Sequence, residues 1–338
     1  MEIRKVQLTG GSSYVVTLPK EWITSNEIKK NDPIGLTIQH DGSLLISPRI
    51  EEKQNFLIKE ISLDGIEQED VAYIHRLLIG AYVAGYNQIV LTSNTRVDPF
   101  IRESVITFIQ HVIGPELIDE DTSSMTIKDL LSPVEMPFKN TIKRMHMIVK
   151  SMHRDIFQAL DEGDVGRAEE IIERDKDVDK LNWLIHRQYN LISSDMGLSK
   201  KMNVTHKEAL LFFTIGRIME RIGDHAVIIA NNIPLLDRKK LGKEMISLLI
   251  DASGLSLKIL DLAMDARKKE DMKMANQCIE MQKQLTEKCN DLADDATKIS
   301  GASSVALSYI SESIRRTGMY GTDISEMVIN TLITDKTE

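Results

Sequence analysis

The feature that most constrains this chain is a long series of amphipathic helical patterns, which continues from Met136 onward. Apolar residues recur at helical spacing, and clear end signals separate the segments, among them a Thr205-x-x-Glu208 capping box and Pro234. We expect six helices joined by short links, which is the pattern of a helical bundle. The expected helices are 136–162, 164–194, 205–232, 239–268, 270–299 and 302–333.

These helices form two copies of a three-helix unit, repeat 1 at 136–233 and repeat 2 at 239–333. The segment AEEIIERDKDVDKL from Ala168 aligns with ANQCIEMQKQLTEK from Ala275, an offset of 107 residues. The segment ERIGDHAVIIA from Glu220 aligns with RRTGMYGTDIS from Arg315, an offset of 95 residues. The difference between the offsets fits the absence of the loop SDMGLSKKMNV from the second copy.

Four acidic residues stand at helical spacing in repeat 1. They form a D-x-x-x-D pair and an E-x-x-x-D pair, namely Asp175 with Asp179 and Glu220 with Asp224. Residues at i and i+4 share one helix face, so two neighbouring helices would present four carboxylates together. Such a cluster of hard oxygen atoms is a suitable site for a divalent cation. We therefore predict a metal site on these residues.

Repeat 2 supports a shared role, because all four acids are absent from it together. The corresponding residues are Gln282, Thr286, Arg315 and Met319. An alternative is that ordinary salt bridges satisfy the acids, since Arg217 lies three residues before Glu220 and Arg221 three before Asp224. Both interpretations stay open at the level of the sequence. The nearby His225 is more typical of an interface histidine than of a ligand.

Residues 1–50 have the pattern of a small β domain. Short β-branched and aliphatic runs, SYVVTLP, IGLTIQ and SLLISP, are separated by Gly-Gly, Asn-Asp-Pro and Asp-Gly turn signals. A domain of this size buries little apolar surface by itself, so we expect it to dimerise.

Residues 54–133 indicate a compact α/β module that links or dimerises the chain. The expected order is strand 56–61, helix 70–84, strand 88–92, helix 98–113, and then two strands, 116–120 and 124–129, that form a hairpin. The module contains neither a glycine-rich phosphate loop nor a cluster of His, Asp and Glu. It therefore offers no site of its own.

The helical region resembles the PhoU family. RIMERIGDHAVIIANN is similar to the signature helix of PhoU proteins, and ERDKDVDKL is similar to its partner helix. The resemblance covers roughly Met136 to Asn330 and implies an all-α bundle of two three-helix repeats at 136–334. PhoU proteins regulate phosphate uptake, and several bind metal clusters through acidic motifs. Metal-ligand roles for Asp175, Asp179, Glu220 and Asp224 follow from the resemblance, whereas repeat 2 departs from the motif.

The N-terminal region resembles a SpoVT-AbrB domain, through RKVQLTGGSSYVVTLPKEWI, IKKNDPIGLTI and DGSLLISP. This family forms a swapped-hairpin β dimer that usually binds DNA. The resemblance implies a homodimer through this head, and it implies DNA contacts by Arg4, Lys5, Ser12, Ser13 and Lys20. An AbrB-like head on a PhoU-like body is similar to phosphate-uptake regulators of the archaeal type.

The charge of the head permits DNA binding without requiring it. Six Lys and Arg stand against five acids in residues 1–50, and the net charge of the chain is −9. Arg4 and Lys5 can equally be charged edge-strand residues that prevent aggregation.

Two functions remain open. The first is a cytoplasmic, dimeric, DNA-binding transcriptional regulator of phosphate uptake with a metal-binding helical sensor body; the metal could be iron, zinc, magnesium or manganese. The second is an adaptor that does not bind DNA, uses the head only for dimerisation and modulates a phosphate transporter, through contact with its subunits, or a signalling partner. We expect no enzyme: a di-iron carboxylate bundle needs Glu-x-x-His on two helices, and the chain contains no Glu-x-x-His. We also expect no membrane insertion, because no apolar run approaches the roughly 20 residues that span a bilayer.

Overall fold

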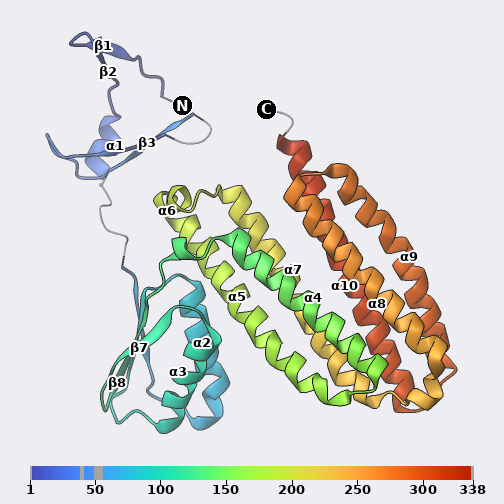
Figure 1. The fold of residues 1–338 in the computed structure, drawn as a ribbon. Coiled ribbons are helices and arrows are strands. Elements are labelled where there is room, and N and C mark those ends of the chain that lie inside the picture. Colours follow the sequence, from blue (N-terminus) through green and yellow to red (C-terminus); the bar gives the residue numbers. More distant parts are fainter. Residues whose placement is uncertain (1, 39–41, 49–55, 336–338) are drawn as a thin grey trace. The chain divides into compact units, whose positions relative to one another are not determined.

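The computed structural model describes residues 2–38, 42–48 and 56–335, and the chain divides into two compact units, Met1–Phe56 and Leu57–Glu338 (Figure 1). The predicted architecture is confirmed: small β hairpins are followed by an α/β region and an all-helical region. The expected boundary between head and module, at residues 50–54, lies outside the described residues, as does Gln39 at the end of a predicted strand.

The N-terminal unit contains two antiparallel hairpins. Strands β1 (Gln7–Thr9) and β2 (Ser13–Val15) pair across a turn in which Gly10 and Gly11 both have positive φ, a conformation that favours glycine. Strands β3 (Gly35–Ile38) and β4 (Leu44–Ser47) form the second hairpin.

A short helix, α1 (Lys20–Ser25), lies between the hairpins, where the sequence analysis expected only strands and turns. That expectation was wrong here. Pro19 precedes the helix in an extended conformation, and Glu21 lies in its first turn, where acidic residues are favourable. Thr24 Oγ1 donates to the Lys20 carbonyl oxygen, and Asn26 Nδ2 donates to the Trp22 carbonyl oxygen, so side chains satisfy the helix end.

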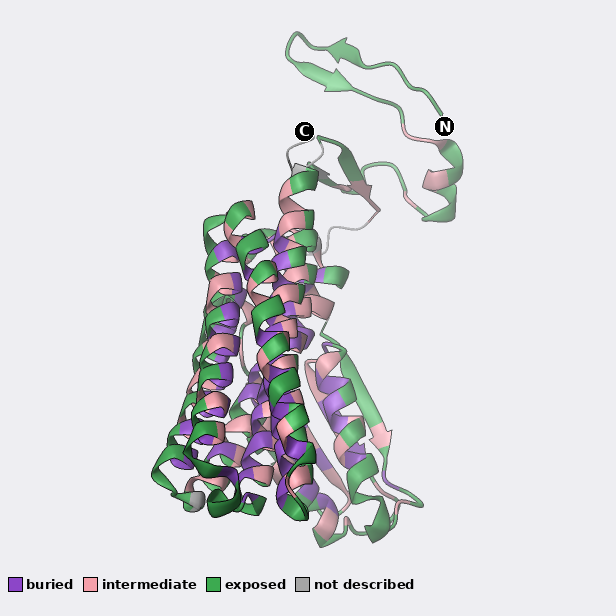
Figure 2. Ribbon diagram, turned by 90° about the vertical axis from the view of Figure 1, so that its right-hand side faces the viewer, coloured by how far each residue is buried: buried purple, intermediate pink, exposed green. Residues whose placement is uncertain are grey.

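The head exposes its apolar side chains. Ile3, Tyr14 and Ile38 are 82%, 77% and 71% exposed, and none of the described residues of this unit is buried. A single copy of the head therefore lacks a hydrophobic core of its own, as Figure 2 shows by its almost continuous exposed colouring.

The α/β module contains a mixed four-stranded sheet in the order β5-β6-β8-β7. Only β5 and β6 are parallel; the other neighbouring strands are antiparallel, and β7 pairs with β8 as the predicted hairpin. The two helices follow β5 and β6 and pack against the sheet around Leu78, Leu91 and Phe108, which are fully buried. The elements are β5 (Ile58–Ser62), α2 (Val71–Val83), β6 (Gln88–Thr92), α3 (Pro99–His111), β7 (Pro115–Glu120) and β8 (Ser124–Asp129).

The bundle contains the six predicted helices, and one hydrophobic core runs through both repeats. Their bounds are α4 (Phe138–Glu162), α5 (Ala168–Ser194), α7 (His206–Asn232), α8 (Arg238–Lys269), α9 (Met272–Thr297) and α10 (Ala302–Asp335). One further helix, α6 (Met196–Lys201), forms in the segment that we expected to be a loop. Asp195 caps it by accepting hydrogen bonds from the backbone N–H groups of Gly197 and Leu198. No helix among the described residues is long and apolar enough to cross a membrane.

Helix α5 fastens the α/β module to the bundle through a buried arginine. Arg187 Nε donates to Asp129 Oδ2 at 2.8 Å, and the guanidinium also donates to the carbonyl oxygens of Tyr82 and Tyr86. The guanidinium carbon lies 4.9 Å from the centre of the Tyr82 ring. The side chains of Arg187 and Asp129 are only 3% and 8% exposed. Each of the three nitrogen atoms of this buried guanidinium therefore donates a hydrogen bond at the contact between module and bundle.

We predict that Arg187→Leu lowers the free energy of unfolding by about 3–5 kcal/mol, because it leaves the Asp129 carboxylate buried without a partner. Urea unfolding followed by circular dichroism measures this change. Arg102→Leu is the matched control: Arg102 pairs with Glu120 at the exposed surface of the same module, and losing that pair should cost less than about 1 kcal/mol. Equal losses in the two variants would contradict the role of Arg187.

Candidate metal centre

Helices α5 and α7 approach each other closely at two glycines of α7. A Cβ atom at Gly223 would lie 2.6 Å from Asp175 Oδ1, and a Cβ atom at Gly216 would lie 3.1 Å from Ile185 Cδ1. A larger residue at either point would displace the facing side chain, Asp175 at Gly223 or Ile185 at Gly216. The missing side chains therefore create the space in which the Asp175 carboxylate lies across α7.

The structure brings the four predicted acids together beside this contact. Burial, reinforced by the charges of Asp179, Asp224 and Glu220, raises the pKa of Asp175 to about 7. Burial and the charges of Glu220 and Asp224 raise the pKa of Asp179 to about 6. The pKa values of Glu220 and Asp224 are also raised, with burial as the largest cause. The cluster is thus a site of uncompensated negative charge.

The neighbouring cations do not neutralise the cluster. Among the residues that the structure describes, neither Arg217 nor Arg221 forms an ion pair with Glu220 or Asp224; their charges only oppose the rise in the pKa of each acid. The alternative interpretation of the sequence, in which ordinary salt bridges satisfy Glu220 and Asp224, requires such pairs. Arg174, which precedes Asp175, is used elsewhere.

Arg174 belongs to a contact between α4 and α5. Its Nη1 donates to Asp155 Oδ2 at 2.7 Å and to Ser151 Oγ at 3.2 Å. Lys176, on the other side of Asp175, pairs with Glu173 at 2.7 Å. Both cations that flank Asp175 in the sequence therefore have partners outside the acidic cluster.

Unpartnered buried atoms lie at the same contact. Asp175 Oδ1 is buried without a hydrogen-bond partner. Asn182, one turn beyond Asp179, is 0% exposed, and neither its Oδ1 nor its Nδ2 has a partner. Its Oδ1 points toward α7, 3.7 Å from where a Cβ atom of Gly216 would lie. The helical spacing of the sequence places Asn182 on the acidic stripe, but only burial shows that its amide is unsatisfied.

These observations fit a hard cation with oxygen ligands, although the ligands are not arranged as a closed cage. In the described part of the chain, no three His, Cys, Asp or Glu side chains already converge as a metal-binding group. Asp224 is exposed and Glu220 is half-buried, so both can rotate toward Asp175. The donor set consists of carboxylate and amide oxygens, which suit a divalent or trivalent metal ion.

Repeat 2 has the same backbone contact without the acids. A Cβ atom at Gly318 would lie 2.5 Å from Gln282 Oε1 and 2.2 Å from Leu285 Cδ2, as Gly223 does with Asp175 and Val178 in repeat 1. The alignment offsets of 107 and 95 residues therefore hold in three dimensions. At the position of Asn182 stands Cys289, a buried free cysteine.

The charge of the second contact is also reversed. Arg315 stands at the position of Glu220 and forms an ion pair with Glu312, which stands at the position of Arg217. Arg315 also donates to Met319 Sδ at 3.2 Å. Repeat 2 thus supplies its own cation where repeat 1 gathers carboxylates.

The two histidines near the cluster behave as interface residues. His225 Nδ1 lies 3.1 Å from Ser313 Oγ of α10, so it contributes to the contact between the repeats. His186 is buried among Trp183 and Phe213, with ring centres at 5.7 and 4.5 Å. Burial lowers the pKa values of both imidazoles.

The predicted DNA-binding residues are all exposed. Ser12 and Ser13 lie at the β1–β2 turn, Lys20 is the first residue of α1, and Lys5 precedes β1. Arg4 pairs with Glu2 and donates to Thr17 Oγ1 at 3.3 Å, so part of its charge is compensated within the head.

Comparison with known proteins now assigns the domains. The PhoU domain model matches residues 142–233, which are repeat 1 with its four acids. Residues 142–233 are a PhoU domain. A second model, antidote-toxin recognition MazE, a bacterial antitoxin, matches residues 7–54. The chain therefore carries a MazE/AbrB-like head and a PhoU domain, as the sequence resemblance predicted.

Comparison with solved structures gives a partial match. The phosphate transport system regulatory protein PhoU from Streptococcus pneumoniae is 19% identical, covers 57% of this chain and 91% of its own, and has a TM-score of 0.49. A direct comparison with curated proteins gives no match. Repeat 2 lies outside the matched PhoU range, in agreement with its loss of the acidic motif.

The pKa of Asp175 generates a prediction for the metal-free protein. Its ordinary value is 3.8 and its folded value is about 7, so between these pH values the native state holds a proton that the unfolded state has lost. Stability therefore falls as the pH rises through this window. Asp175→Asn removes the titration and should stabilise the metal-free protein by about 1–2 kcal/mol at pH 8, after allowance for solvent screening, but little at pH 5.

Urea unfolding at both pH values measures the effect. Asp177→Asn, an exposed position on the same helix, is the control and should show no such pH dependence. If Asp175→Asn is less stable than the wild type at pH 8, the Asp175 carboxylate is not destabilised by burial and by the neighbouring acids, and the prediction is wrong.

Proposed function

We propose that this protein is a cytoplasmic, dimeric transcriptional regulator of phosphate uptake, in which the head binds operator DNA and the helical body binds a metal ion as part of its sensor. The observation that carries the proposal is the combination of a PhoU domain, whose four acids gather at one helix contact, with a MazE/AbrB-like head in the same chain. No catalytic chemistry is proposed.

In the metal site, Asp175, Asp179, Glu220 and Asp224 would hold the ion, and Asn182 lies one turn away as an additional oxygen donor. A bound cation supplies positive charge that neutralises the carboxylates. The chain itself supplies the close contact of α5 with α7 and the burial that makes the charge cluster unfavourable without an ion. Binding would therefore stabilise the α5–α7 contact by mass action.

The exposed apolar residues of the head support dimerisation. Leu8, Tyr14 and Leu36 lie on the hairpins and are 61%, 77% and 61% exposed. A second copy of the head would bury such residues in a shared core, which the single copy lacks. A dimer would also pair two Arg4-Lys5 edges, and so would double the positive charge available to DNA phosphates.

The metal prediction compares two double variants. Glu220→Ala/Asp224→Ala should bind a divalent cation at least tenfold more weakly than the wild type, because it removes half of the carboxylates. Glu169→Ala/Glu170→Ala removes the same charge from exposed positions at the start of α5 and should leave binding unchanged. Elemental analysis after dialysis and titration calorimetry with Mn²⁺, Mg²⁺, Zn²⁺ and Fe²⁺ measure the affinity. Equal metal content in all three proteins would disprove the site.

The DNA prediction uses electrophoretic mobility shift with the promoter of a phosphate transporter operon at moderate salt. We expect a specific shift, and we expect Arg4→Ala/Lys5→Ala to weaken it by about tenfold or more, since two phosphate contacts are lost per chain. Lys29→Ala/Lys30→Ala makes the same charge change elsewhere in the head and should change binding by less than about threefold. The absence of a specific shift would reject the DNA role, and circular dichroism confirms that the variants are folded.

The adaptor is the second candidate, and the compensation of Arg4 by Glu2 favours it. In that case the head only dimerises, and the helical body binds phosphate transporter subunits. Pull-down with those subunits, carried out beside the mobility shift, separates the two functions. Binding to the subunits without any DNA shift would select the adaptor.

A further inference from the structure

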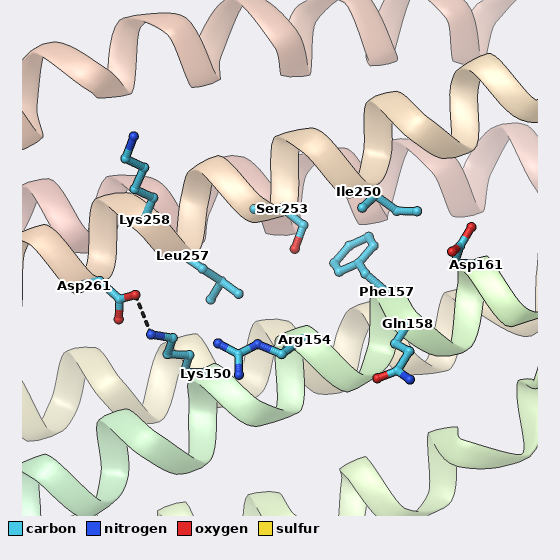
Figure 3. Close-up of a pocket in the computed structure, with 11 residues that line it drawn as sticks. Lys150, Arg154, Phe157, Gln158, Asp161, Ile250, Ser253, Leu257, Lys258 and Asp261 are labelled. Carbon is cyan, nitrogen blue, oxygen red and sulfur yellow. Dashed lines mark hydrogen bonds and ion pairs between the residues drawn. The ribbon is translucent and has the colours of Figure 1, made fainter.

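A groove of about 480 Å³ opens between α4 and α8, the first helices of the two repeats (Figure 3). None of the four acids or Asn182 lines it. Its size lies within the range of about 300–1,000 Å³ that is usual for small-ligand sites. The groove is therefore a candidate ligand site that is separate from the acidic cluster.

The walls of the groove are apolar and its floor contains one polar atom. Phe157 and Leu257 are buried and lie at different points along it with Ser253 between them, and the half-buried Ile250 lies beside Phe157 (Figure 3). The Ser253 side chain is directed into the groove, although the residue is only 2% exposed. Among the described residues, no hydrogen bond uses its hydroxyl group. This hydroxyl is free to bind a ligand.

A glycine keeps the groove open. Gly254 lies in the middle of α8, is exposed, and has no atom within 4 Å of where its Cβ atom would lie. It has neither a positive φ nor a close neighbour, so no feature of the fold requires glycine. Glycine inside a helix costs about 0.5–1 kcal/mol relative to alanine. A side chain here would occupy the groove.

Positive charge gathers at the rim. Lys150 is held by Asp261, with Nζ and Oδ2 2.5 Å apart, and His146 approaches the other oxygen of the same carboxylate at 3.1 Å. In contrast, neither Arg154 nor Lys258 forms an ion pair with any described residue. The lining of the groove contains three cations and two acids, namely Lys150, Arg154 and Lys258, and Asp161 and Asp261. On a chain with a net charge of −9, the groove therefore has a local excess of positive charge, which favours an anionic ligand.

The opposite end of the groove is polar. Gln158 and Asp161 lie there, beyond Phe157 (Figure 3). Gln158 Nε2 donates to Glu162 Oε1 at 2.8 Å, so the Gln158 carbonyl oxygen and the Asp161 carboxylate are the acceptors that can bind the O–H and N–H donors of a sugar or a base, which an aliphatic anion lacks. The order along the groove is thus cationic, apolar and polar.

We propose that this groove binds a nucleoside phosphate. The phosphate binds the Arg154 guanidinium, the flexible side chain of Lys258 turns toward it from α8, the base packs against Phe157 and Ile250, and the Ser253 hydroxyl hydrogen-bonds to the ligand. The proposal goes beyond the regulator function and shares no residue with the metal site. A regulator that holds such a ligand at the contact between its repeats responds to the nucleotide state of the cell.

The experiment is titration calorimetry of the full, metal-free chain with AMP, GMP, CMP and UMP, measured separately. Removal of metal prevents a phosphate from binding through an ion at the acidic cluster. We expect at least one monophosphate to bind at one site per chain, with a dissociation constant below about 1 mM. We also expect inorganic phosphate and the matching nucleoside to bind at least tenfold more weakly, because inorganic phosphate lacks the base and the sugar, and the nucleoside lacks the phosphate.

Two variants of the groove test the assignment. Gly254→Leu fills the open space without a clash, and Arg154→Ala/Lys258→Ala removes the rim charges; each should weaken binding at least tenfold. Gly80→Leu replaces another exposed helical glycine with open space around it, and Lys239→Ala/Lys243→Ala removes two exposed cations of α8 outside the groove. These controls should change the affinity by less than twofold, and Gly254→Leu should not lower the melting temperature.

Three outcomes overturn the proposal: no binding of any monophosphate, equal binding of inorganic phosphate, or unchanged binding in Gly254→Leu. All three are independent of metal binding and of DNA binding. Failure of the proposed function and failure of this inference are therefore distinguishable.

Discussion

The close packing of α5 on α7 is the contact on which the candidate site depends. At Gly223 the Asp175 carboxylate lies against α7. About two turns earlier on α7, Gly216 leaves space for Ile185 of the apolar core. If Gly223 carried a side chain, the Asp175 carboxylate would be displaced from this contact toward water. Its pKa would then return toward the ordinary value, because burial is the largest cause of the shift.

Helix α5 connects this contact to the rest of the unit formed by residues 57–338. Arg174 joins it to α4 next to Asp175, and Arg187 joins it to the α/β module three turns later. A change in the charge of the acidic cluster therefore acts on a helix that is fixed at both ends to other parts of the protein. The α/β module has no site of its own in the sequence, and α5 is bound to it by hydrogen bonds from Arg187 and Asn190.

The sequence predicted the regular elements well because their signals are local. The long helices have apolar stripes and clear caps, and strands β6 and β8 have the predicted ends. The short helices α1 and α6 were missed for the same physical reason: each has six residues, too few for an apolar stripe to repeat. Their stability comes from caps and flanking contacts, which leave no periodic pattern of apolar residues in the sequence.

The four acids could also be predicted, since spacing and their joint loss from repeat 2 are features of sequence. The role of Asn182 could not, because an asparagine on a helical stripe is unremarkable until its burial and unpaired atoms are known. Arg187 is a similar case: its partners lie 58 to 105 residues away in the sequence, and no local pattern selects them. The groove between α4 and α8 likewise exists only after residues about 100 positions apart are packed together.

The two repeats differ in how the charges at the helix contact are balanced. Repeat 2 keeps the glycine at the helix crossing but replaces the acids with neutral groups and an Arg315–Glu312 ion pair, so its charges are balanced internally. Repeat 1 retains four carboxylates; the charges of the others raise the pKa values of Asp175, Asp179 and Glu220, and no arginine among the described residues pairs with any of the four. Both repeats have a glycine at the close helix contact, so the glycine packing alone does not account for the acids of repeat 1. The cation proposed above would bring positive charge to the α5–α7 contact, whereas repeat 2 has its own arginine in that place.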